Sequence, residues 1–391
     1  MNKTFEIANS IFDEIIAIRR EIHKNPEQGF KEFKTSELVQ AKLKEYGVDE
    51  IICPVGTAVI GVIKGTKGSG KTVALRCDMD ALPVLENTGL PFSSQVEGVM
   101  HACGHDLHVA MMLGNAKVLC SMKDEFAGTV KLIFQPSEEV QPGGSRPILE
   151  TGVLDDVDAF FGMHVSPTED EVGKILLKRG PVTTSADEFE IEIIGMGGHG
   201  SAPHKAKDAI LAGCQLNVLF QQVQARNIDP LDTCIFTTNV MQGGTKSNII
   251  ADNCKMYGSV RCYTPEARAV AREKIADICR GVEKLSGCTS KDVVMDGYDA
   301  CINDDGLIDT FIEAYGAENV VMMKTPMGFS EDYSFYATKT GKPSVLMFLS
   351  AGHEDGMPVA TLHSANCTFN EASVPYGISA MSTAALSFLA K

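Results

Sequence analysis

Residues 72–80 read Thr-Val-Ala-Leu-Arg-Cys-Asp-Met-Asp. The first six form a short apolar run of the kind that makes a buried strand, and acidic residues follow where the run stops. Further along the chain, residues 107–123 are predicted to form a helix. An apolar strand followed by a helix is the repeating unit of an α/β sheet.

The same pattern returns twice. Residues 128–134 form a predicted strand that runs out into Glu138-Glu139, and residues 157–162 form another that runs out into His164. Ligands of α/β sheets bind beyond the carboxyl ends of the strands. We therefore expect these side chains, together with Asp80, to lie at one functional edge.

The pattern changes after residue 185. Residues 188–194 alternate strictly between acidic and apolar side chains, as in a strand with one solvated face. Predicted helices and strands then follow at 206–224 (helix), 233–241 (strand), 254–263 (strand), 265–286 (helix) and 291–295 (strand). This β-α-β-β-α-β order is the ferredoxin-like arrangement.

The predicted fold is a mixed-sheet α/β catalytic domain with an inserted ferredoxin-like α+β domain. The catalytic domain is expected over 1–185 and 298–391, and the insertion over 186–297. Outside the segments above, the pattern predicts helices at 5–24, 35–46 and 374–390 and strands at 58–64 and 343–349.

Composition excludes several classes of protein. The chain has 391 residues, enough for two domains, and its 35 basic and 51 acidic residues give a formal charge of −16. Such a charge repels nucleic acid and anionic membranes. The start of the chain shows no signal-peptide pattern, and twelve cysteines without a CxxC pair favour a reducing compartment over a disulfide framework. We expect a cytoplasmic protein.

Residues 100–108 (Met-His-Ala-Cys-Gly-His-Asp-Leu-His) hold three of the nine histidines and one cysteine. Thiolate and imidazole are ligands that borderline transition metals prefer, and Cys103 and His105 can reach one ion from a single loop. This spacing predicts a metal site. The alternative is a surface histidine cluster ahead of a helix, with the cysteine packed as a small hydrophobic residue.

Glu138 and Glu139 are adjacent carboxylates that repel each other unless a positive charge lies near them. Because successive strand residues point in opposite directions, one carboxylate of such a pair can bind an ion while the other acts as general base. The alternative is an exposed acidic start of a loop. His164 and His363 are lone histidines, each of which could equally be structural.

Taken together, five residues on strand ends and loops suit two metal ions that share one bridging ligand. They are Cys103, His105, Glu139, His164 and His363. We therefore predict two divalent ions per subunit, with zinc, manganese, cobalt and nickel all compatible with these donors.

Residues 195–200 (Gly-Met-Gly-Gly-His-Gly) match the dinucleotide fingerprint, and a nicotinamide-dependent oxidoreductase is the alternative from another enzyme class. Three features oppose it. Pro203 and His204 delay the next helix, no acidic residue stands about 20 positions beyond the first glycine, and the preceding strand is half-solvated. A non-catalytic metal-binding protein is a third possibility, which Glu138 argues against because no ligand count requires it.

These motifs resemble those of the M20 metallopeptidase family, most closely its aminoacylase/amidohydrolase branch, which includes hippurate hydrolases, auxin-conjugate hydrolases and N-acetyldiaminopimelate deacetylases. The resemblance covers nearly the whole chain. Its pieces lie at 19–27, 76–83, 100–108, 134–139, 162–164, 198–204, 330–334 and 362–364. Cys77 stands where the branch often has Ala, and residues 366–369 also depart from the usual pattern, which leaves acyl preference open.

The resemblance implies a role for each site residue. It implies five metal ligands, with Cys103 as the bridge: Cys103, His105, Glu139, His164 and His363. It implies that Glu138 is the general base and that Asp80 is the acid that orients a ligand histidine. In the inserted domain, it implies that His199 polarises the scissile carbonyl and that Asn248 and Arg261 contact the substrate carboxylate.

The predicted protein is a metal-dependent amidohydrolase that cleaves N-acyl (acetyl, benzoyl or similar) amino acids or short conjugates. A dipeptidase-like M20 peptidase is the alternative within the family. Since dimeric members pair through the inserted domain, the resemblance implies a homodimer in which His199 acts on the partner's site.

Overall fold

The computed structural model describes residues 3–168 and 171–391. The chain divides into two compact units, each with its own hydrophobic core. The first unit comprises Met1–Gly180, Ile302–Pro326 and Asp332–Lys391, and the second comprises Pro181–Cys301 and Met327–Glu331. That the second unit serves as a lid or a dimerisation domain stays a prediction.

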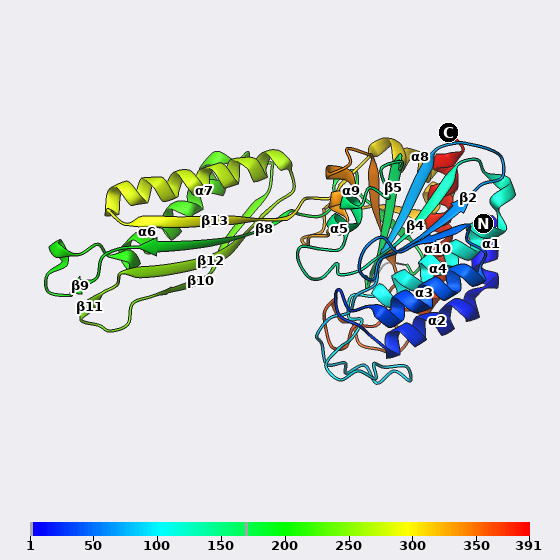
Figure 1. Ribbon diagram of the computed structural model, residues 1–391, viewed down its shortest axis with the longest axis horizontal. Coiled ribbons are helices and arrows are strands. Elements are labelled where there is room, and N and C mark those ends of the chain that lie inside the picture. Colours follow the sequence, from blue (N-terminus) through cyan, green and yellow to red (C-terminus); the bar gives the residue numbers. More distant parts are fainter. Residues whose placement is uncertain (1–2, 169–170) are drawn as a thin grey trace. The chain divides into compact units, whose positions relative to one another are not determined.

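The first unit is built on an eight-stranded mixed sheet with the order β1-β2-β4-β3-β5-β16-β6-β15 (Figure 1). Its strands are β1 (Glu50–Ile52), β2 (Val59–Lys64), β3 (Thr72–Asp78), β4 (Thr129–Gln135), β5 (Ala159–Ser166), β6 (Ile175–Leu177), β15 (Val320–Met322) and β16 (Ser344–Ser350). The four central strands, β4, β3, β5 and β16, are parallel, so their carboxyl ends meet at one edge. The predicted mixed sheet is confirmed.

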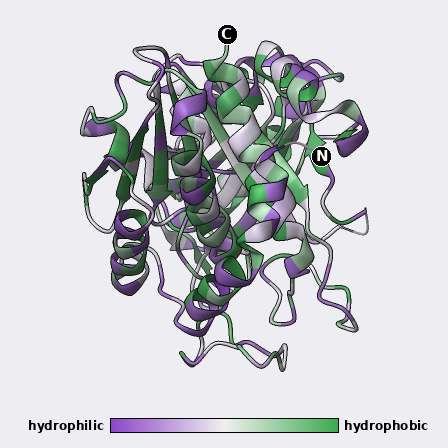
Figure 2. Ribbon diagram, turned by 90° about the vertical axis from the view of Figure 1, so that its right-hand side faces the viewer, coloured by the Kyte–Doolittle hydropathy of each residue, from purple (hydrophilic) through white to green (hydrophobic). Residues whose placement is uncertain are grey.

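Helices cover this sheet. They are α1 (Lys3–Ser10), α2 (Phe12–Lys24), α3 (Phe33–Glu45), α4 (His105–Ser121), α5 (Ser145–Glu150), α8 (Asp305–Tyr315), α9 (Ser334–Thr338) and α10 (Val374–Leu389), with short 3₁₀ turns at Lys123–Glu125, Ala317–Asn319 and Glu371–Ser373. Helices α4 and α10 pack against each other and against β3, and both are buried along most of their length. In Figure 2 the strands are mostly hydrophobic, whereas the outer helices carry hydrophilic residues. No helix of the described residues is long and apolar enough to cross a membrane.

The second unit has the predicted β-α-β-β-α-β order. Its elements are β8 (Ala186–Ile194), α6 (Ala209–Gln222), β10 (Cys234–Gly243), β12 (Asn253–Cys262), α7 (Pro265–Ser286) and β13 (Thr289–Tyr298). The four strands form an antiparallel sheet in the order β10-β12-β8-β13. The side chains of Asp208 and Thr264 cap the two helices at their N-termini. Gly287 ends α7 in the left-handed conformation that favours glycine.

Short elements complete the two units. Strands β9 (Gly198–His199) and β11 (Ile249–Ile250) pair with each other, as do β7 (Gly180–Pro181) and β14 (Ile302–Asn303). A 3₁₀ turn spans Pro203–Lys205, and a π-helical turn at Val223–Asn227 follows α6.

Three predictions of local structure were wrong. His164 lies inside β5 rather than beyond its end, because Val165 and Ser166 extend the buried strand and pair with β16. The helix predicted from residue 107 begins at His105, and the helix predicted over 5–24 breaks at Ile11. Strands β1, β6 and β15 and helices α5, α8 and α9 were not predicted.

Candidate metal centre

The five predicted metal ligands reach the carboxyl edge of the first unit's sheet from different elements. Cys103 precedes α4, His105 is its first residue, Glu139 follows β4, His164 lies in β5 and His363 lies in the loop after β16. Their ligand atoms fall into groups whose members lie within 4.8 Å of one another: Cys103, His105 and His164; Cys103, Glu139 and His363; and His105, Glu138 and Glu139. Cys103, His105 and Glu139 each belong to two of these groups, and the bridging role of Cys103 stays a prediction.

The distances within these groups lie within about 0.2 Å of the range expected for a tetrahedral ion. Sγ of Cys103 lies 3.4 Å from Nε2 of His164, and Nε2 of His363 lies 3.1 Å from Oε1 of Glu139. Nε2 of His105 is 4.0 Å from the same Glu139 oxygen. Tetrahedral zinc sites, with ligands at about 2.0–2.3 Å, hold their donor atoms about 3.3–3.8 Å apart.

Two buried atoms of this cluster test whether its residues fit a metal. Nε2 of His105 and Oε1 of Glu139 have no hydrogen-bond partner among the described residues. A buried polar atom without a partner costs about 1–3 kcal/mol, and a cation between these two would satisfy both. The donor set of thiol, imidazole and carboxylate is that of a transition-metal site. The residues present therefore fit divalent ions.

Each of the two buried ligand histidines is oriented through its other ring nitrogen. Nδ1 of His105 lies 2.8 Å from the carbonyl oxygen of Asp80 and donates to it. Nδ1 of His164 likewise donates to the carbonyl oxygen of Val165 at 2.6 Å. In their neutral form, both rings therefore present Nε2 as an acceptor toward Cys103 and Glu139, which is the arrangement of metal-binding histidines.

Asp80 also holds the acidic pair. Its Oδ1 accepts the backbone N–H of Glu138 at 2.9 Å, and its Oδ2 accepts that of Glu139 at 3.0 Å. The expected alternation of strand side chains was wrong here, because β4 ends at Gln135 and Ser137 turns the chain with φ +50°. Glu138 and Glu139 are instead placed by a turn whose backbone N–H groups donate to Asp80.

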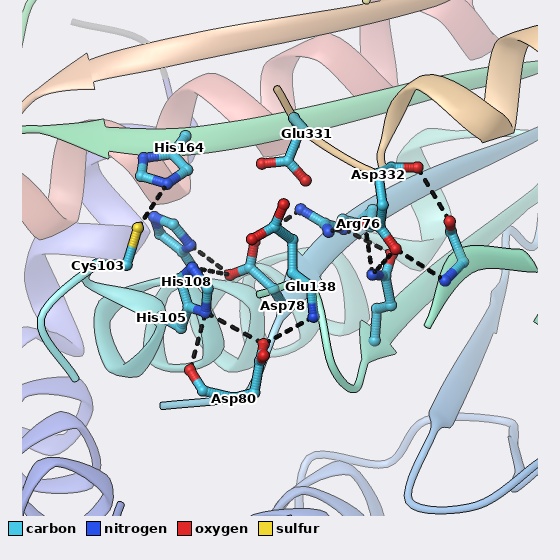
Figure 3. A network of polar contacts seen from close by, with 12 residues as sticks. Arg76, Asp78, Asp80, Cys103, His105, His108, Glu138, His164, Glu331 and Asp332 are labelled. Atoms are coloured by element: carbon cyan, nitrogen blue, oxygen red, sulfur yellow. Dashed lines mark hydrogen bonds and ion pairs between the residues drawn. The ribbon is translucent and has the colours of Figure 1, made fainter. Parts of the chain in front are cut away.

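A second layer of buried polar residues lies beneath the ligands (Figure 3). Oδ1 of Asp78 accepts from Nδ1 of His108 at 2.6 Å, and Nε2 of His108 accepts the backbone N–H of Val165 at 2.8 Å. Both ring nitrogens of His108 are thus used, so it is no free ligand although it lies close to His105. Through Val165, His108 also fixes the strand that carries His164.

Arg76 joins this layer to Asp332. Its guanidinium donates to Asp78 at 2.7 Å and to Asp332 at 2.8 Å, and all three side chains are buried. Burial alone would raise the pKa of Asp78, but His105, His108 and Arg76 hold it well below its usual range. Sequence reasoning gave these residues no role. One feature of the sequence could have indicated them: Arg76 lies inside an otherwise apolar strand, and a buried arginine needs a buried acidic partner.

The charge of the cluster is strongly negative. Burial alone would lower the pKa of His105, but the carboxylates of Asp78, Asp80 and Glu139 outweigh it and raise that pKa to about 10. Such a potential attracts cations to the position of Nε2.

Two predicted substrate residues of the second unit lie together. His199, in β9, and Asn248 line one hollow, and the backbone N–H of Gly200 donates to the carbonyl of Asn248 at 2.9 Å. Nδ1 of His199 accepts the backbone N–H of Ser201 at 3.2 Å. The neutral ring therefore carries its proton on Nε2, the form that can donate to a carbonyl oxygen.

Arg261 does not join them. It stands one residue before the other end of β12, where Cys262 exchanges two hydrogen bonds with Ser185. The structure also contradicts the nucleotide-binding alternative, since Gly198 and His199 form a strand and α6 begins only at Ala209. A phosphate-binding turn needs the helix directly after the glycines.

Comparison with known proteins gives a consistent result. Residues 74–387 match the model of Peptidase family M20/M25/M40. The chain is 40% identical to thermostable carboxypeptidase 1 of Saccharolobus solfataricus, covering 97% of this chain and 96% of that one, and 38% identical to the hippurate hydrolase of Campylobacter jejuni, covering 95% and 96%. The crystal structure of a Bacillus subtilis dinuclear metal-binding peptidase from the M20 family superposes with a TM-score of 0.84 at 32% identity, covering 98% of this chain and 99% of that one.

Proposed function

The chain belongs to peptidase family M20/M25/M40, and from this premise we propose that it hydrolyses the amide bond of N-acyl amino acids, releasing a carboxylic acid and a free amino acid. Membership makes it a metal-dependent hydrolase of amide or peptide bonds. The similarity to a hippurate hydrolase and to an N-acyl-L-amino acid amidohydrolase supports the substrate class, and the place of Glu138 supports the hydrolytic chemistry. This carboxylate lies beside the candidate ligands His105 and Glu139, on a backbone that Asp80 holds.

In the proposed reaction, Glu138 removes a proton from the attacking water and later delivers it to the leaving amine. Divalent ions bound by Cys103, His105, Glu139, His164 and His363 would supply a Lewis acid and lower the pKa of water to about 7. Nε2–H of His199 donates to the oxygen of the scissile carbonyl as negative charge develops there. We propose two ions per subunit; thiolate and imidazole favour zinc, while manganese, cobalt and nickel accept the same donors.

We further propose that His199 acts in trans within a homodimer. Arg261 lies at the end of the inserted sheet where the chain enters and leaves the unit, whereas His199 and Asn248 lie beyond the other end of β12. Eight residues of strand separate Arg261 from Asn253, about 26 Å at a rise of about 3.3 Å per residue. Since Arg261 and His199 are both proposed to contact one small substrate, two chains are needed to supply them.

The surface of the inserted unit supports a partner copy. Leu211 and Val218 on α6 are 57% and 69% exposed, and β10 is an edge strand with apolar residues in the open. Apolar groups gathered on one small unit are typical of an interface.

A mixing experiment tests the trans assignment. Glu138→Ala and His199→Ala proteins, each inactive, are combined under conditions that exchange subunits. In a mixed dimer one site carries both lesions and the other carries none, so activity returns. If exchange is demonstrated and activity stays absent, His199 serves its own chain.

A carboxypeptidase or dipeptidase activity is the second candidate, which the 40% identity to a thermostable carboxypeptidase favours. A panel of N-acetyl, N-benzoyl and indole-acyl amino acids beside dipeptides, with each metal added back, separates the two. The proposal predicts a higher kcat/KM for acyl amino acids than for dipeptides. Higher values on dipeptides, or turnover of neither class, would contradict it.

A further inference from the structure

The segment 27–32, which leads into α3, contacts both chain segments that carry the candidate catalytic groups. At one end of it, the carbonyl oxygen of Glu27 accepts the backbone N–H of Ala81 at 2.8 Å, and Gln28 forms a β-bridge with Ala81. Ala81 directly follows Asp80. The segment 27–32 is therefore hydrogen-bonded to the chain next to Asp80, whose carboxylate accepts the N–H groups of Glu138 and Glu139.

The other end of the segment reaches the acidic turn itself. The side chain of Glu32 is fully buried, and its Oε1 accepts the backbone N–H of Ser137 at 2.8 Å and that of Phe30 at 3.0 Å. Its Oε2 accepts the hydroxyl of Thr57 at 2.6 Å. Burial raises the pKa of Glu32, and the nearby charge of Asp80 adds to the effect.

Three consecutive backbone N–H groups, those of residues 137–139, thus point at two buried carboxylates, Glu32 for the first and Asp80 for the next two. Ser137 has a φ of +50°, a conformation that a non-glycine residue holds only when its surroundings impose it. Gly29 packs so closely that a Cβ there would lie 2.6 Å from Oγ of Ser137. The turn 137–139 is therefore held by hydrogen bonds to Glu32 and Asp80 and by the close packing of Gly29.

We propose that Glu32 is a positioning residue that fixes the turn 137–139 and so sets the directions of the base Glu138 and the ligand Glu139. This inference rests on the proposed function, because it takes the roles of those two carboxylates from it. Glu32 touches neither substrate nor metal; it acts through the N–H of Ser137. What the position requires is a hydrogen-bond acceptor and not a negative charge.

The variants Glu32→Gln and Glu32→Leu separate these requirements. Glutamine keeps an oxygen for Ser137 and Phe30, while its amide can donate to the Thr57 hydroxyl. Leucine leaves the buried N–H of Ser137 without an acceptor. Thr57→Val is the matched control, because it removes a partner of Glu32 that does not touch the turn.

Two readouts are measured on protein whose folded fraction is known from thermal denaturation. The first is the visible absorption spectrum of protein titrated with Co²⁺ alone, which reports the geometry of the Glu139 ligand without needing turnover. The second is kcat and KM on the N-acyl amino acid that the wild type cleaves best. Loss of an outer hydrogen-bond partner of a metal site costs about 10- to 100-fold in activity or metal affinity.

We expect Glu32→Leu to change the Co²⁺ spectrum and to lose about 10- to 100-fold in kcat per folded molecule with little change in KM. Glu32→Gln and Thr57→Val should stay within about threefold of wild type with unaltered spectra, well below the loss from a missing outer partner. Equal losses in the glutamine and leucine variants would overturn the proposal, as would a leucine variant whose folded molecules match wild type in both readouts. If the wild type cleaves no amide but the spectra still separate the variants, the proposed function fails while the positioning role stands.

Discussion

The two units differ in the surroundings of their candidate site residues. Under the sheet edge of the first unit lie Asp78, Asp80, His105 and Glu138, all less than 10% exposed and joined by hydrogen bonds and ion pairs. The second unit has an apolar core and also a largely buried ion pair between Asp187 and Arg268, but its candidate residues His199 and Asn248 are exposed. Shifted pKa values and metal affinity require buried charge, so the proposed metal ligands and the proposed general base all belong to the first unit. The second can supply contacts to the substrate.

This difference extends to what stabilises each unit. Removing one partner of a buried charge pair leaves the other uncompensated, which costs about 3–5 kcal/mol, so the first unit depends on its network. The second depends mainly on packing, including the stacked rings of Phe189 and Phe236 at 4.9 Å, beside its ion pair between Asp187 and Arg268. Mutations of buried residues around the metal cluster should therefore affect chemistry, whereas mutations in the second unit's core should affect folding.

The largest effect is expected from the ligands. Cys103→Ala and His105→Ala each remove a donor from the cluster, so bound metal and turnover should fall together, with turnover reaching the uncatalysed rate. Elemental analysis beside a hydrolysis assay measures both quantities. Full metal content in both variants would remove the basis for placing the metals in the first unit.

The next effect separates the adjacent carboxylates. Glu138→Ala should keep its metal and its fold while kcat falls by about 10²- to 10⁴-fold, the share of a general base. Glu139→Ala should lose metal instead. Identical metal contents and rates in the two variants would show that the roles are shared or reversed.

Asp80→Asn should have a smaller effect of about 10- to 100-fold on metal affinity or kcat. The amide keeps one oxygen but turns an N–H toward one of the two backbone N–H groups of Glu138 and Glu139. A metal titration measures the affinity, and steady-state kinetics on the metal-loaded protein measures kcat. Wild-type values would mean that the turn does not need this carboxylate.

Arg261→Ala should affect recognition alone. Losing one hydrogen bond to a charged group costs about 1.5–3 kcal/mol, so KM should rise by at least about tenfold with kcat and metal content unchanged. Steady-state kinetics checks this with acyl amino acids and with the matching acyl amides, which lack the carboxylate that Arg261 is proposed to contact. A loss in kcat alone would give Arg261 a part in the chemistry and contradict its proposed role in recognition.

The smallest effect on catalysis is expected from the second unit's core. Leu216, on α6, is 1% exposed, and Leu216→Ala should cost about 2–5 kcal/mol of unfolding free energy. Metal content should not change. Denaturant unfolding and elemental analysis measure the two effects, and a loss of metal would contradict the separation of the units.

Local patterns predicted the parts of the fold that depend on periodicity. The alternation in residues 188–194 identified a strand with one buried face, and the apolar run at 72–77 identified a central one. The groups that orient the site could not be predicted, because Asp78 and His108 are 30 residues apart and Glu32 and Ser137 are 105 apart. Spacing in the sequence does not encode such partners. His164 was misplaced for a related reason, since pairing with β16 carries its strand past the predicted end.

The most direct test of a two-metal amidohydrolase is a titration of metal-stripped protein with Mn²⁺ or Zn²⁺ during hydrolysis of N-benzoylglycine and N-acetyl amino acids. We expect no turnover without metal, and a rise that reaches its plateau at two equivalents per chain. Full activity in protein shown to be free of metal would contradict the account, as would fully loaded protein that cleaves none of these amides.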